Sequence, residues 1–262
     1  MSDCSSQFEA TGGDLVLSSA ILLYKAGWNR NAQGSPAFAS IHAVEQHDTG
    51  PVIAAGQPLT RQKLRRWTEI LGQSAAPEIL PENVLVAHPD MLVWWLPEQV
   101  RQAYFHITTP TKDLTTLHTK CTVPVPYPAH LLVATRKGLG VYALKDSKRP
   151  TADTAVLHSP VLNVFLDGKL CWGNIAKPKS LGVAAIPEFE RAVFESWSTH
   201  PNAGQNQTIT GKGGLVRLWD DLATRKAQRF PVRVLKPFYP AERRPANAAP
   251  VTVGQLIKKA SL

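Results

Sequence analysis

One short stretch of the chain combines a cysteine, an amide and a tight-turn signal. Residues 163–174 read NVFLDGKLCWGN, in which Asn163 precedes Cys171 by eight positions. The Asp-Gly pair in this stretch predicts a two-residue hairpin turn, because both central positions of such a turn need positive φ. That turn would pair Val164 with Cys171 and leave Asn163 near Trp172, at the rim of a sheet. A thiol held there beside an amide could act as a nucleophile, with the amide donating to a developing oxyanion.

The same pattern also fits an inert cysteine in a buried strand, since a free thiol packs as a small apolar group. The neighbouring Asn163 argues against that interpretation, because an amide is a poor partner in an apolar core. The other two cysteines lack such a neighbour. Cys4 lies in a polar N-terminal stretch, and Cys121 stands beside the proline-rich TVPVPYP. We expect Cys4 and Cys121 to be dispensable for any activity.

Other common chemistries have no matching pattern in the sequence. The eight histidines form no HExxH or His-x-His, and the three cysteines form no CxxC pair. We therefore expect no catalytic or structural metal site and no disulfide framework. The glycines of TGKGG lack phosphate-loop spacing, and no GxSxG motif is present. No cofactor is expected.

The composition predicts a folded protein of many short elements. Apolar residues make up 44% of the 262 residues, enough for a sizeable core, and 21 prolines argue against an all-helical fold. The longest apolar run, residues 15–24, is about half the length that a membrane span needs. The first residues are polar and acidic, unlike a secretory signal. We expect a cytoplasmic protein with no membrane segment.

The positive charge is concentrated at the C-terminal end. Of the net charge of +9, most lies in residues 225–262, where nine basic side chains face one acidic side chain, Glu242. This segment is either a solvated tail or a docking surface for an acidic partner or nucleic acid. Because residues 241–250 are rich in Pro, Ala and Arg, we expect removal of residues 241–262 to leave the fold intact.

The order of elements predicts an α+β fold, an antiparallel sheet with flanking helices. Strand-like patterns cover 15–24, 39–47, 50–58, 83–88, 90–97, 131–138 and 140–144. Helical patterns cover 59–72, 186–197 and 213–226, and residues 124–130 look like a proline-stiffened connection. In the second helix, Phe189, Val193 and Trp197 are expected to form a buried stripe.

The stretch around Cys171 resembles the active site of ubiquitin-conjugating enzymes, whose His-Pro-Asn motif precedes the cysteine with the spacing of Asn163, Gly168 and Cys171. Together with MLVWWLP, GVYALKDSKRP and FESWSTHPN, it is similar to the PRTRC system protein B family, a plasmid-borne prokaryotic branch of that superfamily. The resemblance extends from about Leu15 to Pro237. Val161 and Leu162 replace the expected His and Pro.

The resemblance implies an organisation into three parts. These are an N-terminal strand-rich extension (1–57), a ubiquitin-conjugating-enzyme-like core (58–236) and a basic C-terminal tail (237–262). It also implies that Cys171 carries a ubiquitin-like protein as a thioester and that Asn163 donates to the oxyanion. His200, in a second His-Pro-Asn at 200–202, is a candidate neighbour of the site.

The family's gene cassettes imply specific partners. These are a ThiF-like adenylating enzyme, a small ubiquitin-like protein, a JAB-type isopeptidase and a ParB-related protein. Two other functions stay open at this point. A conjugating-fold scaffold would bind the same partners without forming a thioester, and a nucleic-acid-binding accessory would use the basic C-terminal segment.

Overall fold

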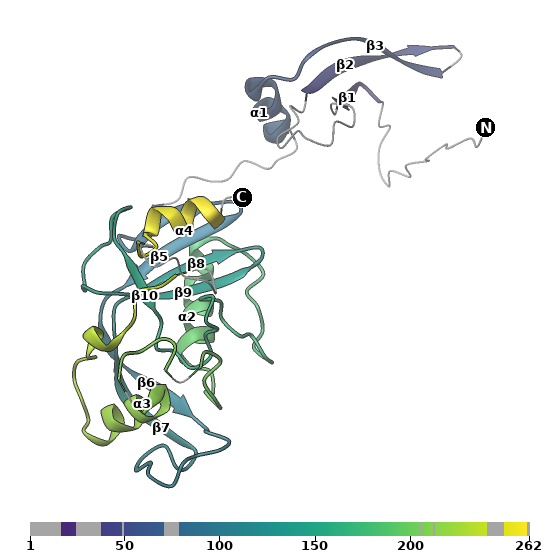
Figure 1. Cartoon of the computed structure of the whole chain (residues 1–262). Helices are drawn as coiled ribbons and strands as arrows, with labels where there is room; N and C mark the ends of the chain where they lie inside the picture. Colours follow the sequence, from purple (N-terminus) through teal and green to yellow (C-terminus); the bar gives the residue numbers. More distant parts are fainter. Residues whose placement is uncertain are drawn as a thin grey trace, which may run out of the picture. The chain divides into compact units, whose positions relative to one another are not determined.

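The computed structural model divides the chain into two compact units, Met1–Glu78 and Ile79–Leu262 (Figure 1). It describes residues 17–24, 38–48, 50–70, 79–204, 206–211, 213–239 and 249–260, without the side chains of 66–70. None of the described helices is long and apolar enough to cross a bilayer.

The first unit holds an antiparallel three-stranded sheet and a helix. The strands lie in the order β1 (Ser19–Tyr24), β2 (Phe38–His47) and β3 (Gly50–Pro58), followed by α1 (Arg61–Ile70). As expected of an N-cap, Thr60 accepts a hydrogen bond from the Lys63 N–H through Oγ1.

The helix α1 belongs to the first unit, whereas the sequence placed it in a core that starts at residue 58. The backbone N–H of Leu59 still donates to Ala39 in β2, so the chain stays tied to the first sheet up to the start of α1. The compact second unit begins only at Ile79.

A five-stranded antiparallel sheet forms the centre of the second unit, in the order β10-β9-β8-β5-β4. Its members are β4 (Val84–His88), β5 (Met91–Leu96), β8 (His130–Thr135), β9 (Gly138–Leu144) and β10 (Val156–His158). The strand predictions for this region are confirmed, and the α+β class with antiparallel strands is the one observed.

Between β5 and β8 the chain forms a separate hairpin, β6 (Gln99–Phe105) with β7 (Cys121–Tyr127). The prediction of a connection at 124–130 is therefore wrong for its first half. Pro124 and Pro126 lie inside β7, opposite Gln102 and Val100. A proline has no N–H to donate, but β7 pairs with β6 alone in this two-stranded sheet, so an edge position tolerates it.

The two faces of the five-stranded sheet are buried by different partners. One face, which includes Leu92, Trp94 and Leu132, packs into the larger core with α2 (Ile186–Phe194) and α3 (Gly214–Thr224). The other face, which includes Val93 and Leu131, packs against α4 (Val253–Ala260). Figure 1 shows α4 and α3 at opposite ends of this unit.

Helix α2 ends earlier than predicted. Phe189 and Val193 are buried as expected, but the helix stops at Phe194 and Trp197 is 41% exposed. Beyond the helix, the chain pairs with β6, where the N–H of Ser198 donates to Tyr104 and that of His106 donates to Ser198. This pairing turns Trp197 away from the helical stripe that the spacing predicted.

The C-terminal segment also differs from the expected tail. Phe238, Val253 and Leu256 are 1%, 2% and 7% exposed, and all three lie in the smaller core. The expectation that residues 241–262 can be removed without harm to the fold is therefore wrong, because the removal would uncover one face of the sheet. Lys258 and Lys259 lie on the exposed side of α4.

We expect Leu256→Ala to lower the free energy of unfolding by about 3 kcal/mol, the usual cost of truncating a buried leucine. Lys258→Ala on the same helix is the matched control and should change it by less than about 0.5 kcal/mol. Urea denaturation followed by tryptophan fluorescence measures both. Equal effects of the two substitutions would contradict the packing of α4 on the sheet.

Two buried histidines make the stability depend on pH. Burial lowers the pKa of His130 from 6.5 to about 4, despite the hydrogen bond of its Nδ1 to the Pro128 carbonyl. Burial, with the charge of Lys236, lowers the pKa of His158 to about 4 as well. Both rings are therefore neutral in the folded protein at neutral pH.

Because the unfolded chain binds these protons more readily, stability should be complete above pH 6.5 and fall as the pH drops toward 4. Each histidine contributes a slope of about 1.4 kcal/mol per pH unit in that window. Urea denaturation at a series of pH values measures it. His130→Gln and His158→Gln should each reduce the slope, and an unchanged slope would contradict the assignment.

Candidate functional site

The hairpin that carries Cys171 turns over three residues, and the predicted two-residue turn is wrong. The N–H of Gly168 donates to the Phe165 carbonyl, and the N–H of Phe165 donates to the Lys169 carbonyl, both at 2.9 Å. Gly168 has φ +84°, the left-handed conformation that typically follows the turn in a three-residue hairpin loop. The added residue shifts the register by one position.

The shifted register sets Asn163 directly opposite Cys171. The N–H of Cys171 donates to the Asn163 carbonyl at 2.7 Å, while Val164 bridges to Leu170. The sequence had paired Val164 with Cys171. Both Asn163 and Cys171 are partly buried, between the closed core and the surface. The amide and the thiol thus start from neighbouring backbone positions on two strands.

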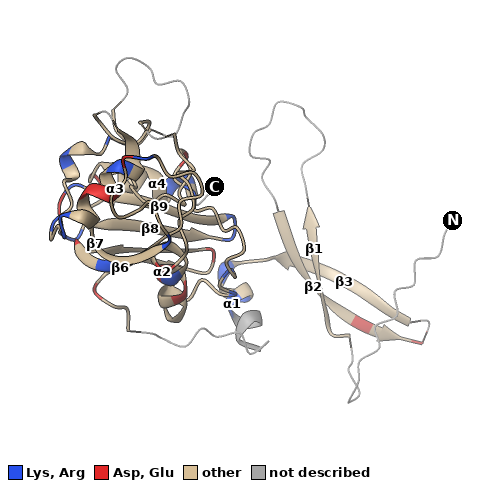
Figure 2. Cartoon of the chain, turned by 90° about the horizontal axis from the view of Figure 1, so that it is seen from below, with Lys and Arg blue, Asp and Glu red and all other residues tan. Residues whose placement is uncertain are grey.

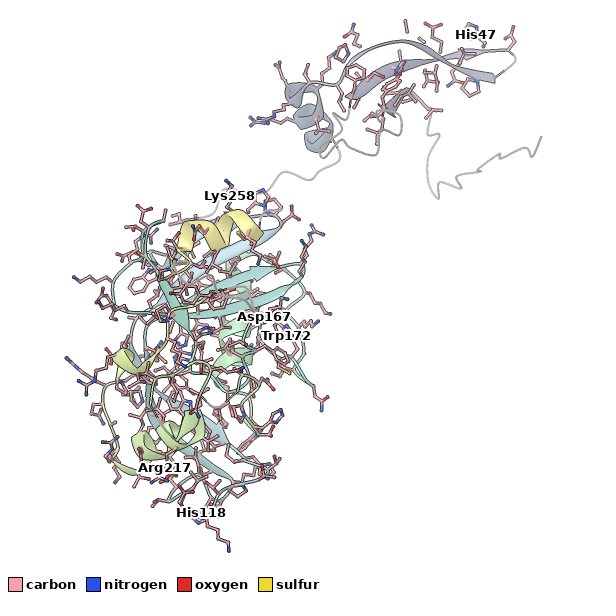
Figure 3. The ribbon with its side chains drawn as sticks, in the orientation of Figure 1. His47, His118, Asp167, Trp172, Arg217 and Lys258 are labelled. Atoms are coloured by element: carbon pink, nitrogen blue, oxygen red, sulfur yellow. The ribbon has the colours of Figure 1, made fainter. Side chains whose placement is uncertain are left out.

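The hairpin is held against the sheet by β9. The N–H of Val141 donates to the Gly168 carbonyl, and the N–H of Leu170 donates to the Leu139 carbonyl, both at 2.8 Å. These bonds use the edge of β9 beside the part that pairs with β10. Figure 3 shows Asp167 and Trp172, from the turn and from the end of the second arm, on the same side of the unit.

The ring of Tyr142 fills the space that two glycines leave open. A Cβ atom at Gly168 would lie 2.5 Å from Cε1 of Tyr142, and one at Gly140 would lie 2.8 Å from its Cε2. Burial, reinforced by the charge of Asp167, raises the pKa of Tyr142 to about 12, so the ring is neutral. No sequence motif marks Tyr142 as part of the site, although GVYAL places it on a predicted strand.

The side chain of Asn163 connects the hairpin to a second segment. Its Nδ2 donates to the Trp197 carbonyl at 3.3 Å, which uses one of the two N–H groups of the amide. Close by, the N–H of Asn202 donates to the Leu162 carbonyl at 2.9 Å. Residues 197–202 therefore run beside the first arm of the hairpin, a proximity for which the sequence holds no local signal.

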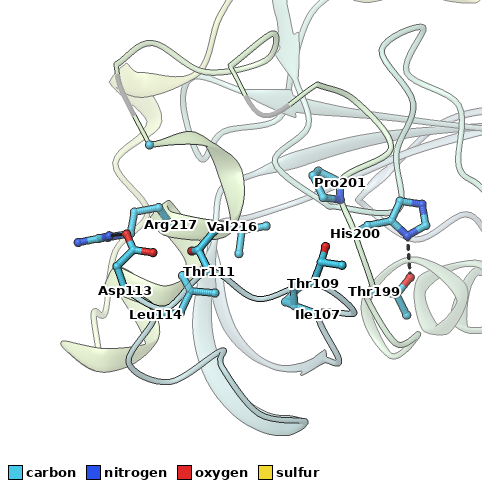
Figure 4. A pocket seen from close by; sticks show the side chains of 11 residues that line it. Ile107, Thr109, Thr111, Asp113, Leu114, Thr199, His200, Pro201, Val216 and Arg217 are labelled. Atoms are coloured by element: carbon cyan, nitrogen blue, oxygen red, sulfur yellow. Dashed lines mark hydrogen bonds and ion pairs between the residues drawn. The ribbon is translucent and has the colours of Figure 1, made fainter.

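His200 belongs to this second segment but lines a different cavity, of about 200 Å³ (Figure 4). Its Nδ1 and the hydroxyl of Thr199 are 2.9 Å apart, and the ion pair of Asp113 with Arg217 lies at the other end of the cavity. Neither Asn163 nor Cys171 is among the described residues that line it. The structure brings Asn163 and Cys171 together and places His200 in a neighbouring hollow.

Val161 and Leu162, which stand at the positions of the missing His-Pro pair, are part of the hydrophobic core. Val161 is 4% exposed and Leu162 is 1% exposed. The upstream His158 is buried, with its ring 5.0 Å from that of Phe238. Its ring is therefore not available at the surface beside the hairpin.

Cys121 lies in a setting that disfavours a thiolate. Burial raises the pKa of its thiol, and the negative charge of Asp220 raises it further. The Asp220 carboxylate accepts hydrogen bonds from the backbone N–H groups of three consecutive loop residues, Thr115, Thr116 and Leu117. Cys4 lies outside the described residues. Within the described part of the chain, no cluster of three or more His, Cys, Asp or Glu could hold a metal ion.

Residues 64–238 match the family model of prokaryotic E2 family D. The chain belongs to this family. Comparison with curated proteins and with solved structures found no match. E2 proteins are the ubiquitin-conjugating enzymes, so membership indicates a ubiquitin-conjugating-like role, and the antiparallel α+β fold is consistent with it.

The match to prokaryotic E2 family D includes the hairpin with Cys171 and the segment with His200. It ends at Phe238, which lies in the smaller core, and does not include α4. Within the second unit, the helix that covers one face of the sheet thus lies outside the region that defines the family.

We expect Gly168→Ala to destabilise this E2-family protein by about 3 kcal/mol, because it adds left-handed strain and a clash with the buried Tyr142. Gly173→Ala is the matched control. Gly173 also has positive φ, +45°, but a Cβ there meets nothing within 4 Å. It should cost only about 1 kcal/mol, from the conformation alone.

Urea denaturation of both variants measures the difference. If Gly168→Ala lowers the free energy of unfolding no more than Gly173→Ala does, the Tyr142 ring moves aside at no cost in free energy. The hairpin would then not depend on the contact between this ring and the two glycines.

Proposed function

We propose that this protein carries a ubiquitin-like protein as a thioester on Cys171 and passes it to an amine. The observation that carries the proposal is the hairpin register, which sets Asn163 opposite Cys171 in a member of an E2 family. The spacing in the sequence suggested a functional pair, and the 2.7 Å backbone contact supports it. No cofactor enters this step.

In the loading step, the thiolate of Cys171 attacks the thioester carbonyl of the ubiquitin-like protein on its activating enzyme. A new carbon–sulfur bond forms to Cys171, and the bond to the activating enzyme's cysteine breaks, so that this cysteine leaves as a thiolate. Cysteine suits the exchange because a thiolate is both a strong nucleophile and a good leaving group. ATP is consumed earlier, when the activating enzyme adenylates the ubiquitin-like protein.

In the transfer step, an amine attacks the same carbonyl. The carbon–nitrogen bond forms, the nitrogen loses a proton to water or to a base, and Cys171 leaves as a thiolate. Negative charge develops on the carbonyl oxygen during the attack. The Asn163 amide would stabilise it with the N–H that does not donate to Trp197.

His200 is the candidate base for the amine in this proposal. It is exposed and two residues from Asn202, whose N–H donates to Leu162 beside Asn163. Because His200 lines a neighbouring cavity, the amine would have to approach from that side of the site. General-base assistance of this kind typically contributes about 100-fold or more.

The partners follow from the similarity to PRTRC system protein B, to which we assign the chain as part of this proposal. A ThiF-like adenylating enzyme would load Cys171 with a small ubiquitin-like protein. A JAB-type isopeptidase would reverse the modification, and a ParB-related protein would share the plasmid-borne cassette. Contact with nucleic acid through the basic C-terminal segment stays a prediction from charge.

A non-catalytic scaffold is the second candidate. The observation that favours it is that Asn163 already forms hydrogen bonds within the fold. Its backbone carbonyl accepts from the Cys171 N–H, and its side-chain amide donates to the Trp197 carbonyl. The replacement of His-Pro by the buried Val161 and Leu162 points the same way. A scaffold would bind the same partners and form no thioester.

We expect the protein, mixed with the adenylating enzyme, ATP and the ubiquitin-like protein, to form an adduct that reductant removes. Cys171→Ala should abolish the adduct, and Cys171→Ser should give an ester that resists reductant, because an oxygen ester does not exchange with thiols. Gels run with and without reductant measure both. No adduct under conditions that charge the adenylating enzyme would favour the scaffold.

Asn163→Ala should still load but discharge to an amine about 10- to 1000-fold more slowly, as expected for loss of an oxyanion donor. Discharge to free lysine, followed over time, measures the rate. Cys121→Ser is the matched control and should load and discharge normally. Loss of the adduct in the Cys121 variant, with the protein folded, would mean that Cys171 is the wrong nucleophile.

A further inference from the structure

A cavity of about 320 Å³ is lined in part by Trp172, the residue that follows Cys171. Three parts of the chain form its wall: the turn between β8 and β9, Trp172 with the segment that follows it, and Phe189 of α2. We call it the basic cavity, after its cationic lining residues Arg136, Lys137, Lys177 and Lys179. Figure 2 draws the described lysines and arginines in blue.

The basic cavity has an excess of positive charge, carried by Lys137, Lys177 and Lys179. Its described lining residues include no carboxylate. The fourth cation, Arg136, forms an exposed ion pair with Asp90 at 2.6 Å, so the excess charge comes from the three lysines. Lys177 lies over the ring of Trp172, at 5.8 Å from its centroid. Like charges around a small hollow produce a local potential that attracts anions.

The same cavity also has an apolar wall. Trp172 packs against the main core, with its ring 6.4 Å from that of Phe189. Leu181 and Pro178 complete this side. A ligand that fits must therefore offer an apolar group to the rings and negative charge to the lysines. An acidic peptide with an aromatic or aliphatic side chain meets both requirements.

We propose that the basic cavity binds a segment of a partner protein beside Cys171. This segment is acidic and has one aromatic or aliphatic side chain. Lys137, Lys177 and Lys179 would meet its carboxylates, while Trp172 and Leu181, which are partly exposed, would receive its apolar side chain. The purpose of this docking rests on the proposed thioester function, since it would hold the partner at the reacting residue. The binding itself requires no thiol.

A peptide fits the cavity better than a nucleic acid does. Proteins that bind single strands usually present several exposed aromatic rings on which successive bases stack. Here Trp172 is partly buried, and Phe189 is 4% exposed, so neither ring offers an open stacking surface. A hollow of this volume accepts a few side chains.

The test measures binding of a fluorescein-labelled, glutamate-rich peptide with one phenylalanine to the full-length protein by fluorescence anisotropy. We expect Lys177→Ala combined with Lys179→Ala to weaken binding roughly tenfold. The matched control combines Lys145→Ala with Lys148→Ala, two exposed lysines that follow β9 at the end away from the β8–β9 turn. The control should leave binding unchanged, and affinity should fall as salt rises.

Several results would overturn the inference. Equal weakening by both double variants would mean attraction to net charge alone, and equal binding of a peptide with glutamine in place of glutamate would remove the carboxylate requirement. Tighter binding of a single-stranded oligothymidylate, lost on the same Lys177 and Lys179 changes, would make the cavity a nucleic-acid site.

The two proposals can fail separately in this design. Cys171→Ala should bind the peptide as the unaltered protein does, because the cavity needs no thiol. Peptide binding without any thioester would overturn the proposed function and keep the basic cavity. A thioester that forms in a protein with no affinity for the peptide would overturn the cavity and keep the function.

Discussion

The edge of β9 is the constraint on which the site depends. A strand edge presents N–H and C=O groups that need partners when they are buried. On β9 the short β10 covers the end near Leu144, and the hairpin with Cys171 takes the bonds of Leu139 and Val141. The hairpin is therefore part of the sheet, and its register follows from that pairing.

Once the register is set, the rest of the site follows from short contacts. Gly168 takes a left-handed conformation, and the ring of Tyr142 occupies the space beside it and beside Gly140. Asn163 then faces Cys171 and reaches the Trp197 carbonyl. A change at any of these residues would move the thiol relative to the segment that holds His200.

The hairpin turn and the basic cavity, on either side of Cys171, differ in net charge. At the hairpin turn, Lys169 and Asp167 form an ion pair at 2.8 Å, which leaves the turn itself nearly neutral. The basic cavity beyond Trp172 is lined by four cations, of which only Arg136 pairs with a carboxylate in the described part of the chain, that of Asp90. Such an imbalance favours the approach of an acidic partner to the cavity side of the hairpin.

Local sequence patterns predicted four of the five strands of the main sheet, the starts of three helices and the candidate pair of Asn163 and Cys171. These features depend on local patterns: alternation of apolar residues, helical spacing of apolar residues, and eight positions of spacing around an Asp-Gly turn. The hairpin register depends on tertiary contacts, because the edge of β9 selects among turns that the same residues can form. The tertiary structure also decided that Pro124 and Pro126 lie in an edge strand, that Trp197 leaves the helix and that α4 packs on the sheet, since each depends on a partner distant in the chain.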